Sequence, residues 1–258
     1  MIRVYKNFEK VPTILNSDNR KEAFDKNIQS KDYIDKSNLY KVTSVQNELA
    51  KIYHFKCGYC EKDIKDEDIH IEHYRPKSRY YWLAYSWDNL LFSCGQCNRP
   101  KGKKFLTKKC SNLYAKEPFD DIHTLGFKYD KEESPMIINP EKDDVLDDIV
   151  FDKNAKISSH NERVQYTIDK ACNLNRNGLV ENRIKLFNAL KRRVVKHMHN
   201  RDVTGLESEI ENFIEECTIK NEYFAFRYFI LNHVNLFFEN RTIQKVVLKV
   251  IDKNIQTI

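Results

Sequence analysis

Two short cysteine pairs are the first candidate ligands for a metal ion. Each pair has two residues between its thiols, in the segments Cys57-Gly-Tyr-Cys60 and Cys94-Gly-Gln-Cys97. Four thiolates in this arrangement can hold one tetrahedral zinc ion, and they leave it no open position for a substrate. We therefore expect a structural zinc site. Any chemistry must come from residues between or beside the two pairs.

Hydrolytic chemistry is indicated by residues in and just after the segment between the pairs. Glu72 adjoins His73 there, Asn89 lies further along, and Asn98 follows the last cysteine. A neutral imidazole accepts a proton near physiological pH, so His73 suits the role of general base. Glu72 and Asn98 offer the oxygen ligands that Mg²⁺ prefers. This set predicts a phosphodiester hydrolase in which a divalent cation stabilises the charge that builds on the phosphate.

In the order and spacing of these residues the chain resembles the HNH (ββα-metal) endonucleases. Longer segments resemble the HNH proteins of Septu-type and retron-associated phage-defence systems, namely Cys57-Gly-Tyr-Cys60-Glu61, Ile71-Glu72-His73-Tyr74-Arg75-Pro76-Lys77 and Cys97-Asn98-Arg99-Pro100-Lys101-Gly102. The resemblance implies that Glu72 and Asn98 bind a catalytic Mg²⁺ or Mn²⁺ and that Asn89 orients His73. It also implies antiviral defence with an ATPase partner of the ABC or SMC-like type, or with a retron reverse transcriptase and its msDNA.

Basic residues flank the candidate site on both sides. Two follow His73 closely, and an acid-free basic run extends from Arg99 to Lys109. Lysine and arginine side chains that neutralise phosphates supply most of the non-specific affinity for nucleic acid. A solvated helix face is the alternative for the run. We expect six residues to contact the substrate: Arg75, Lys77, Arg99, Lys101, Lys103 and Lys104.

Composition agrees with a cytoplasmic enzyme that acts on nucleic acid. The chain has 258 residues, 41% of them hydrophobic, which is enough for a sizeable core, and its net charge is +6. No apolar run reaches the roughly 18 residues of a membrane span, and no signal core is visible, so we expect neither membrane insertion nor secretion. Four of the seven cysteines have metal-binding spacing, which suits a reducing compartment.

Hydrophobic periodicity predicts an α+β fold with a mainly α-helical chain, and the resemblance implies that a small zinc-stapled ββα-metal core is embedded in it. We expect a helical and extended segment at 1–55, the nuclease core with its four-cysteine zinc site at 56–115, and a mainly helical region at 116–258. Strands are expected near 68–72, 80–91 and 136–139, and a helix after Asn98 with Pro100 in its first turn. Further helices are expected at 44–55, 179–199, 206–217, 222–238 and 242–255.

Two alternatives to a DNA nuclease stay open. The same site could cut RNA, for example a tRNA, because phosphate contacts do not read the sugar or the base. A catalytically silent zinc module could instead grip nucleic acid as one subunit of a complex, although such a module needs no Glu-His pair. The aromatic segment 222–238 is explained by core burial or by a partner surface. The acidic residues between Glu141 and Asp152 could face a partner as well.

Overall fold

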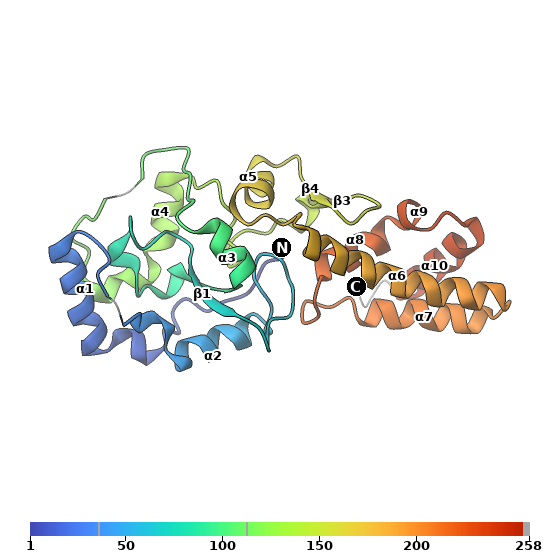
Figure 1. The fold of residues 1–258 in the computed structure, drawn as a ribbon, viewed down its shortest axis with the longest axis horizontal. Helices are drawn as coiled ribbons and strands as arrows, with labels where there is room; N and C mark the ends of the chain where they lie inside the picture. Colours follow the sequence, from blue (N-terminus) through green and yellow to red (C-terminus); the bar gives the residue numbers. More distant parts are fainter. Residues whose placement is uncertain (36, 112, 255–258) are drawn as a thin grey trace.

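Two antiparallel strands organise the first part of the chain. The computed structural model describes residues 1–35, 37–111 and 113–254. In it, β1 (Ile69–His73) pairs with β2 (Leu90–Cys94), and α3 (Gly95–Lys101) follows β2 directly and packs on both strands. Figure 1 shows this ββα unit among α1, α2 and α4, while α6, α7 and α10 form an arm that extends away from it. The expected helix-dominated α+β class is confirmed.

The sequence explains where β1 ends. Ile69 and Ile71 alternate with polar residues, as in a half-buried strand, and His73 is the last residue of the ladder. Pro76 lies just beyond and has no N–H to donate to a partner strand. Glu72 and His73 point to opposite faces of a straight strand. Because β1 ends at His73, both side chains reach the space at the end of the strand.

Three expectations for individual elements are wrong. Residues 80–91 mostly form the 3₁₀ turns η3 (Tyr81–Leu83) and η4 (Trp87–Asn89), because this apolar run lacks the two-residue alternation of a strand. Pro100 lies in the last turn of α3, since the helix begins at Gly95 within the cysteine pair. Residues 136–139 form no strand, and an unexpected hairpin of β3 (Val150–Phe151) and β4 (Ile157–Ser158) follows them.

The predicted helices are largely confirmed. Before and beside the ββα unit lie α1 (Asp18–Ser30), α2 (Thr43–Ile52), α4 (Leu125–Glu133) and α5 (Glu162–Tyr166), and beyond it α6 (Asn177–His199), α7 (Val203–Glu215), α8 (Phe224–Asn232), α9 (Val234–Phe237) and α10 (Arg241–Asn254). Residue 255 of the last predicted helix is outside the described part. None of the helices in the described ranges is long and apolar enough to cross a membrane. The division at residues 55 and 115 stays a prediction.

The aromatic segment 222–238 is two helices rather than one. It breaks at His233, whose backbone angles (φ −131°, ψ 46°) are not helical. Phe226 and Phe229 are buried, and their rings pack against Phe151 and Phe237. Core burial therefore accounts for most of the apolar surface of this segment.

Two buried ion pairs fasten the ββα unit to its neighbours. Arg75, just after β1, is only 1% exposed and donates to Asp130 (2.7 Å) and Glu133 (2.8 Å) of α4. Lys6 pairs with Glu141 at 3.0 Å and donates to the Trp87 and Leu90 carbonyls that flank the start of β2. These contacts correct two expectations. Arg75 was expected to contact the substrate, but its side chain is buried against α4. The acidic segment from Glu141 to Asp152 was expected to be available to a partner, but the Glu141 carboxylate is buried and pairs with Lys6.

Replacing Arg75 by alanine should destabilise the fold strongly. The change leaves the buried Glu133 carboxylate without its guanidinium charge, and breaking a buried pair in this way costs about 3–5 kcal/mol of unfolding free energy. Arg79→Ala is the matched control, because Arg79 is exposed and donates to the Phe105 backbone carbonyl rather than to a buried carboxylate. Urea denaturation measures both variants. Equal effects of the two substitutions would contradict a stabilising role for the buried pair.

Candidate active site and metal centres

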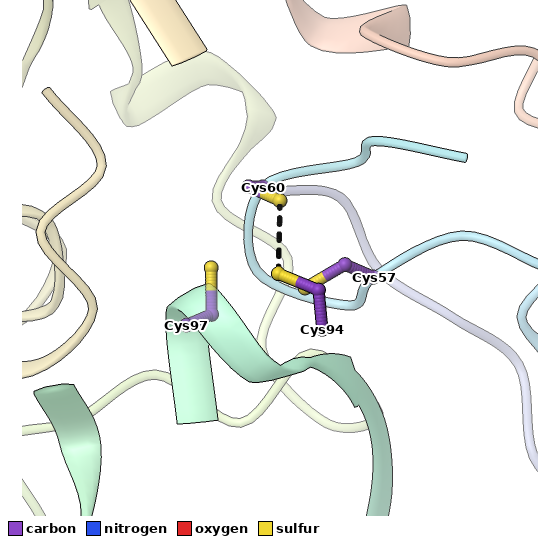
Figure 2. A group of neighbouring side chains, drawn as sticks. All are labelled: Cys57, Cys60, Cys94 and Cys97. Carbon is purple, nitrogen blue, oxygen red and sulfur yellow. Dashed lines mark hydrogen bonds between the residues drawn. The ribbon is translucent and has the colours of Figure 1, made fainter. Parts of the chain in front are cut away.

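The four paired cysteines converge at the point where the helical arm meets the ββα unit. Their sulfur atoms all lie within 4.8 Å of one another, and all four residues are buried. Figure 2 shows the Cys97 sulfur pointing from α3 toward the other three, and the Cys60 and Cys94 sulfurs are 3.8 Å apart. Zn–S bonds of about 2.3 Å in a tetrahedron place sulfurs about 3.8 Å apart. The cluster therefore fits zinc.

Local packing explains the glycine in the first cysteine pair. The Gly58 N–H donates to the Phe92 carbonyl at 3.0 Å, which brings the cysteine turn onto β2. A Cβ atom at this position would lie 2.7 Å from the Tyr53 ring and 3.2 Å from Pro140. The turn can approach the strand this closely because residue 58 has no side chain.

Arg176 is a residue of the zinc site that the cysteine spacing does not indicate. It stands immediately before α6, and its guanidinium donates to the sulfur of Cys97 at 3.4 Å and to that of Cys94 at 3.9 Å. A cation beside four thiolates offsets their charge and orients them. Arg176 thereby joins the helical arm to the cysteine cluster. A lone arginine about 80 residues downstream carries no local signal of this role.

His73 is held as a neutral base. It is 6% exposed, and its Nε2 donates to the Ala84 carbonyl at 2.9 Å, which leaves Nδ1 as the nitrogen that accepts a proton. The pKa of His73 is lowered to about 3, mainly by burial; the Ala84 hydrogen bond opposes this shift, and the nearby Lys77, Lys101 and Lys41 charges add to it. The imidazole is therefore uncharged at physiological pH, as a general base requires.

Tyr40 packs directly against the His73 ring. The two ring centroids are 4.4 Å apart in an edge-to-face arrangement, and Tyr40 belongs to η2 (Leu39–Lys41). The Lys77 ammonium donates to the Tyr40 hydroxyl at 2.9 Å and lies over the Tyr33 ring. The N-terminal segment thus builds one wall of the site. No motif in that segment indicates it, because the contact is entirely between distant parts of the chain.

Asn89 ties together the backbone segments on either side of His73. Its side-chain oxygen accepts from the Arg75 N–H at 2.7 Å, and its amide donates to the carbonyls of Arg75 and Leu83 at 3.1 Å. These bonds tie the end of β1 to the turn that carries the Ala84 carbonyl, the hydrogen-bond partner of His73. The orienting role that the resemblance implies for Asn89 stays a prediction, and these bonds would make it an indirect one.

One pocket of about 240 Å³ collects the candidate catalytic residues. Glu72, His73 and Asn98 line it, and Asn98 contributes a hydrogen bond to Glu72. Burial raises the pKa of the Glu72 carboxyl, and the charge of Lys101 opposes that shift. The Glu72 carboxylate and the Asn98 side-chain amide line the same pocket, and their oxygens are the kind of donor that suits Mg²⁺ or Mn²⁺. These residues fit a second, catalytic metal ion.

The fold places the basic residues that were predicted to contact nucleic acid in different environments. Lys77 and Lys103 line the pocket, and Lys41 joins them from the N-terminal segment. Lys101 is fully buried, so it cannot contact nucleic acid as expected. Arg99 pairs with Asp68, and Lys104 donates to the Lys170 carbonyl, so both charges are directed outside the pocket. The run from Arg99 to Lys109 is not one continuous track.

Comparison with known proteins agrees with this geometry. Residues 57–104, which hold both cysteine pairs, the Glu-His pair and Asn98, match the model of the HNH endonuclease family. The chain contains an HNH endonuclease domain. This domain accounts for the ββα unit, its zinc-type cysteine cluster and the pocket at the end of β1.

Curated relatives come from Septu systems. Septu protein PtuB of Bacillus mycoides (strain KBAB4) is 35% identical over 144 residues, which are 50% of this chain and 46% of that protein. Septu protein PtuA of the same strain is 26% identical over 155 residues, 54% of this chain and 20% of that protein. PtuB of Bacillus thuringiensis is 41% identical over 56 residues, 21% and 22% of the two chains. The chain spans less than half the length of these relatives.

Purified protein should contain about one zinc ion per chain in the cysteine site. Cys94→Ser should lose the ion and unfold the HNH domain, because binding of a structural zinc supplies folding free energy directly. Cys110→Ser is the control, since this exposed cysteine is outside the cluster. Elemental analysis and circular dichroism measure the two effects. A folded Cys94→Ser variant that lacks zinc would show that the metal does not support the fold.

Proposed function

We propose that this chain is a metal-dependent endonuclease that hydrolyses phosphodiester bonds in nucleic acid, with DNA as the expected substrate. The carrying observation is the convergence of a neutral His73, Glu72 and Asn98 in one pocket with three lysines at its wall. A silent binding module would not need a buried, oriented imidazole beside a carboxylate. The proposal places catalysis in this pocket and leaves the cysteine cluster a structural role.

The residues divide the work of hydrolysis. His73 uses Nδ1 to take a proton from water, while the Ala84 carbonyl and the Tyr40 ring hold the imidazole in place. Lys77 and Lys103 attract the phosphates on either side of the scissile bond. Glu72 and Asn98 would hold Mg²⁺ or Mn²⁺, which stabilises charge on the phosphate when bound. Four thiolates around zinc leave no position for substrate, so zinc takes no part in this step.

His73→Ala should reduce the cleavage rate by roughly two to four orders of magnitude, the usual contribution of a general base. Binding to nucleic acid and the zinc content should be unchanged. His160→Ala is the control, because His160 is exposed and does not line the pocket. Cleavage of labelled DNA and RNA oligonucleotides with Mg²⁺ measures the rates. Unchanged cutting by His73→Ala would show that His73 is not the base and would contradict the proposed site, whereas a parent protein that binds but does not cut would favour the silent binding module.

Replacement of Lys41 and Lys103 together by alanine should weaken binding without regard to base sequence. Each lost contact to duplex phosphate should reduce the slope of log K against log salt by about 0.9, because fewer counterions are released. The control is Lys104→Ala with Lys108→Ala, which removes the same charge from residues directed at the Lys170 carbonyl and Glu162. Fluorescence anisotropy with the His73→Ala protein gives both slopes. A larger change in the control pair would place the nucleic acid elsewhere.

We further propose that the nuclease serves phage defence with a partner ATPase. Support comes from the likeness to PtuB and PtuA and from the need to restrain a nuclease with a complete site. A retron reverse transcriptase with its msDNA is the second candidate partner, and RNA the second candidate substrate. Co-expression with an ATPase encoded beside its own gene should change both the elution volume and the cleavage rate of the chain. Identical behaviour with and without the ATPase would contradict this regulation.

A further inference from the structure

Lys101 is a buried cation that contacts Glu72, one of the two candidate ligands of the catalytic metal. None of its surface is exposed, and its Nζ donates to Glu72 Oε1 at 2.5 Å and to the His73 carbonyl at 2.7 Å. It lies one helical turn after Asn98 on α3. The Lys101 ammonium therefore contacts both the Glu72 carboxylate and the backbone of His73, the candidate base.

Packing alone does not explain a charge at this position. Burying an ammonium is costly, and an apolar side chain of similar volume in place of a buried ion pair is often neutral or stabilising. Contact with nucleic acid does not explain it either, because the side chain has no exposed surface. What the lysine supplies, and an apolar residue cannot, is a pair of hydrogen bonds from α3 to the last residues of β1.

We propose that Lys101 is a positioning residue that sets Glu72 at the correct place relative to Asn98, so that both can bind one divalent cation. The inference rests on the proposed function of the pocket. The bond to Glu72 selects one orientation of the carboxylate, and the bond to the His73 carbonyl fixes the end of β1 against α3. The register between strand and helix then sets the spacing of the two metal ligands.

If Lys101 acted only through its charge, its removal would change metal affinity in the opposite direction from a loss of positioning. Removing a positive charge next to a cation site lowers the repulsion that an incoming divalent ion meets, so binding should become tighter. Loss of positioning should make it weaker. The direction of the change in metal affinity therefore separates the two roles of Lys101.

Titration calorimetry with Mn²⁺ on the zinc-loaded, full-length protein without nucleic acid tests the proposal. Lys101→Met should weaken Mn²⁺ binding at least tenfold and keep the zinc content. In a Glu72→Gln background the same substitution should have little further effect, because the lysine acts through that carboxylate. Lys104→Met is the matched control, because it removes the same charge from a lysine that donates to the Lys170 carbonyl. This variant protein should bind Mn²⁺ as tightly as the parent does.

Each outcome separates this inference from the proposed function. Equal or tighter Mn²⁺ binding by Lys101→Met overturns the positioning role while the nuclease proposal stands. Equal binding by the parent and Glu72→Gln means that the pocket holds no metal through Glu72, and the proposed function itself fails. Lys101→Gln, which keeps a donor without the charge, is measured if Lys101→Met does not fold. Loss of fold and zinc in both variants shows that Lys101 serves only the core and also overturns the proposal.

Discussion

The convergence of four buried cysteine sulfurs is the constraint on which the site depends. It connects a turn before β1 with the junction between the last residue of β2 and the first turn of α3, two parts of the chain that are distant in sequence. Because Cys97 is followed directly by Asn98, closing the cluster also determines where Asn98 lies relative to β1. A structural metal ion in the cluster can thus set the distance between Asn98 and the residues at the end of β1.

The cluster also joins the two parts of the molecule. Arg176, immediately before α6, donates hydrogen bonds to the sulfurs of Cys94 and Cys97, so the helical arm contacts the HNH domain at the cysteine cluster. Arg75 connects the end of β1 to α4, and Lys6 connects the start of β2 to Glu141. The ββα unit is too small to bury a large core of its own, and these buried charges tie it to a larger protein.

Basic residues serve different purposes that their spacing does not distinguish. Arg75, Lys77 and Lys101 all follow the Glu-His pair or Asn98 closely, yet Arg75 and Lys101 are buried while Lys77 lines the pocket. The net charge of +6 therefore overstates the positive surface near the site. Two of the nearest cations, Arg75 and Lys101, hold the end of β1 and the Glu72 carboxylate, and lysines from three segments line the pocket.

The sequence by itself determined the cysteine cluster, the α+β class and the candidate set of Glu72, His73 and Asn98, because each depends on short-range spacing or on periodicity. Strand boundaries in the aromatic run 80–91 were not predictable, since packing on all sides removes the alternation that marks a strand. Only the tertiary structure decided that Tyr40 packs against His73, that Arg176 meets the thiols and that Lys101 turns inward. Those contacts join residues far apart in the chain or depend on which face of α3 is covered, and burial of a charge is decided by its partners rather than by its neighbours in sequence.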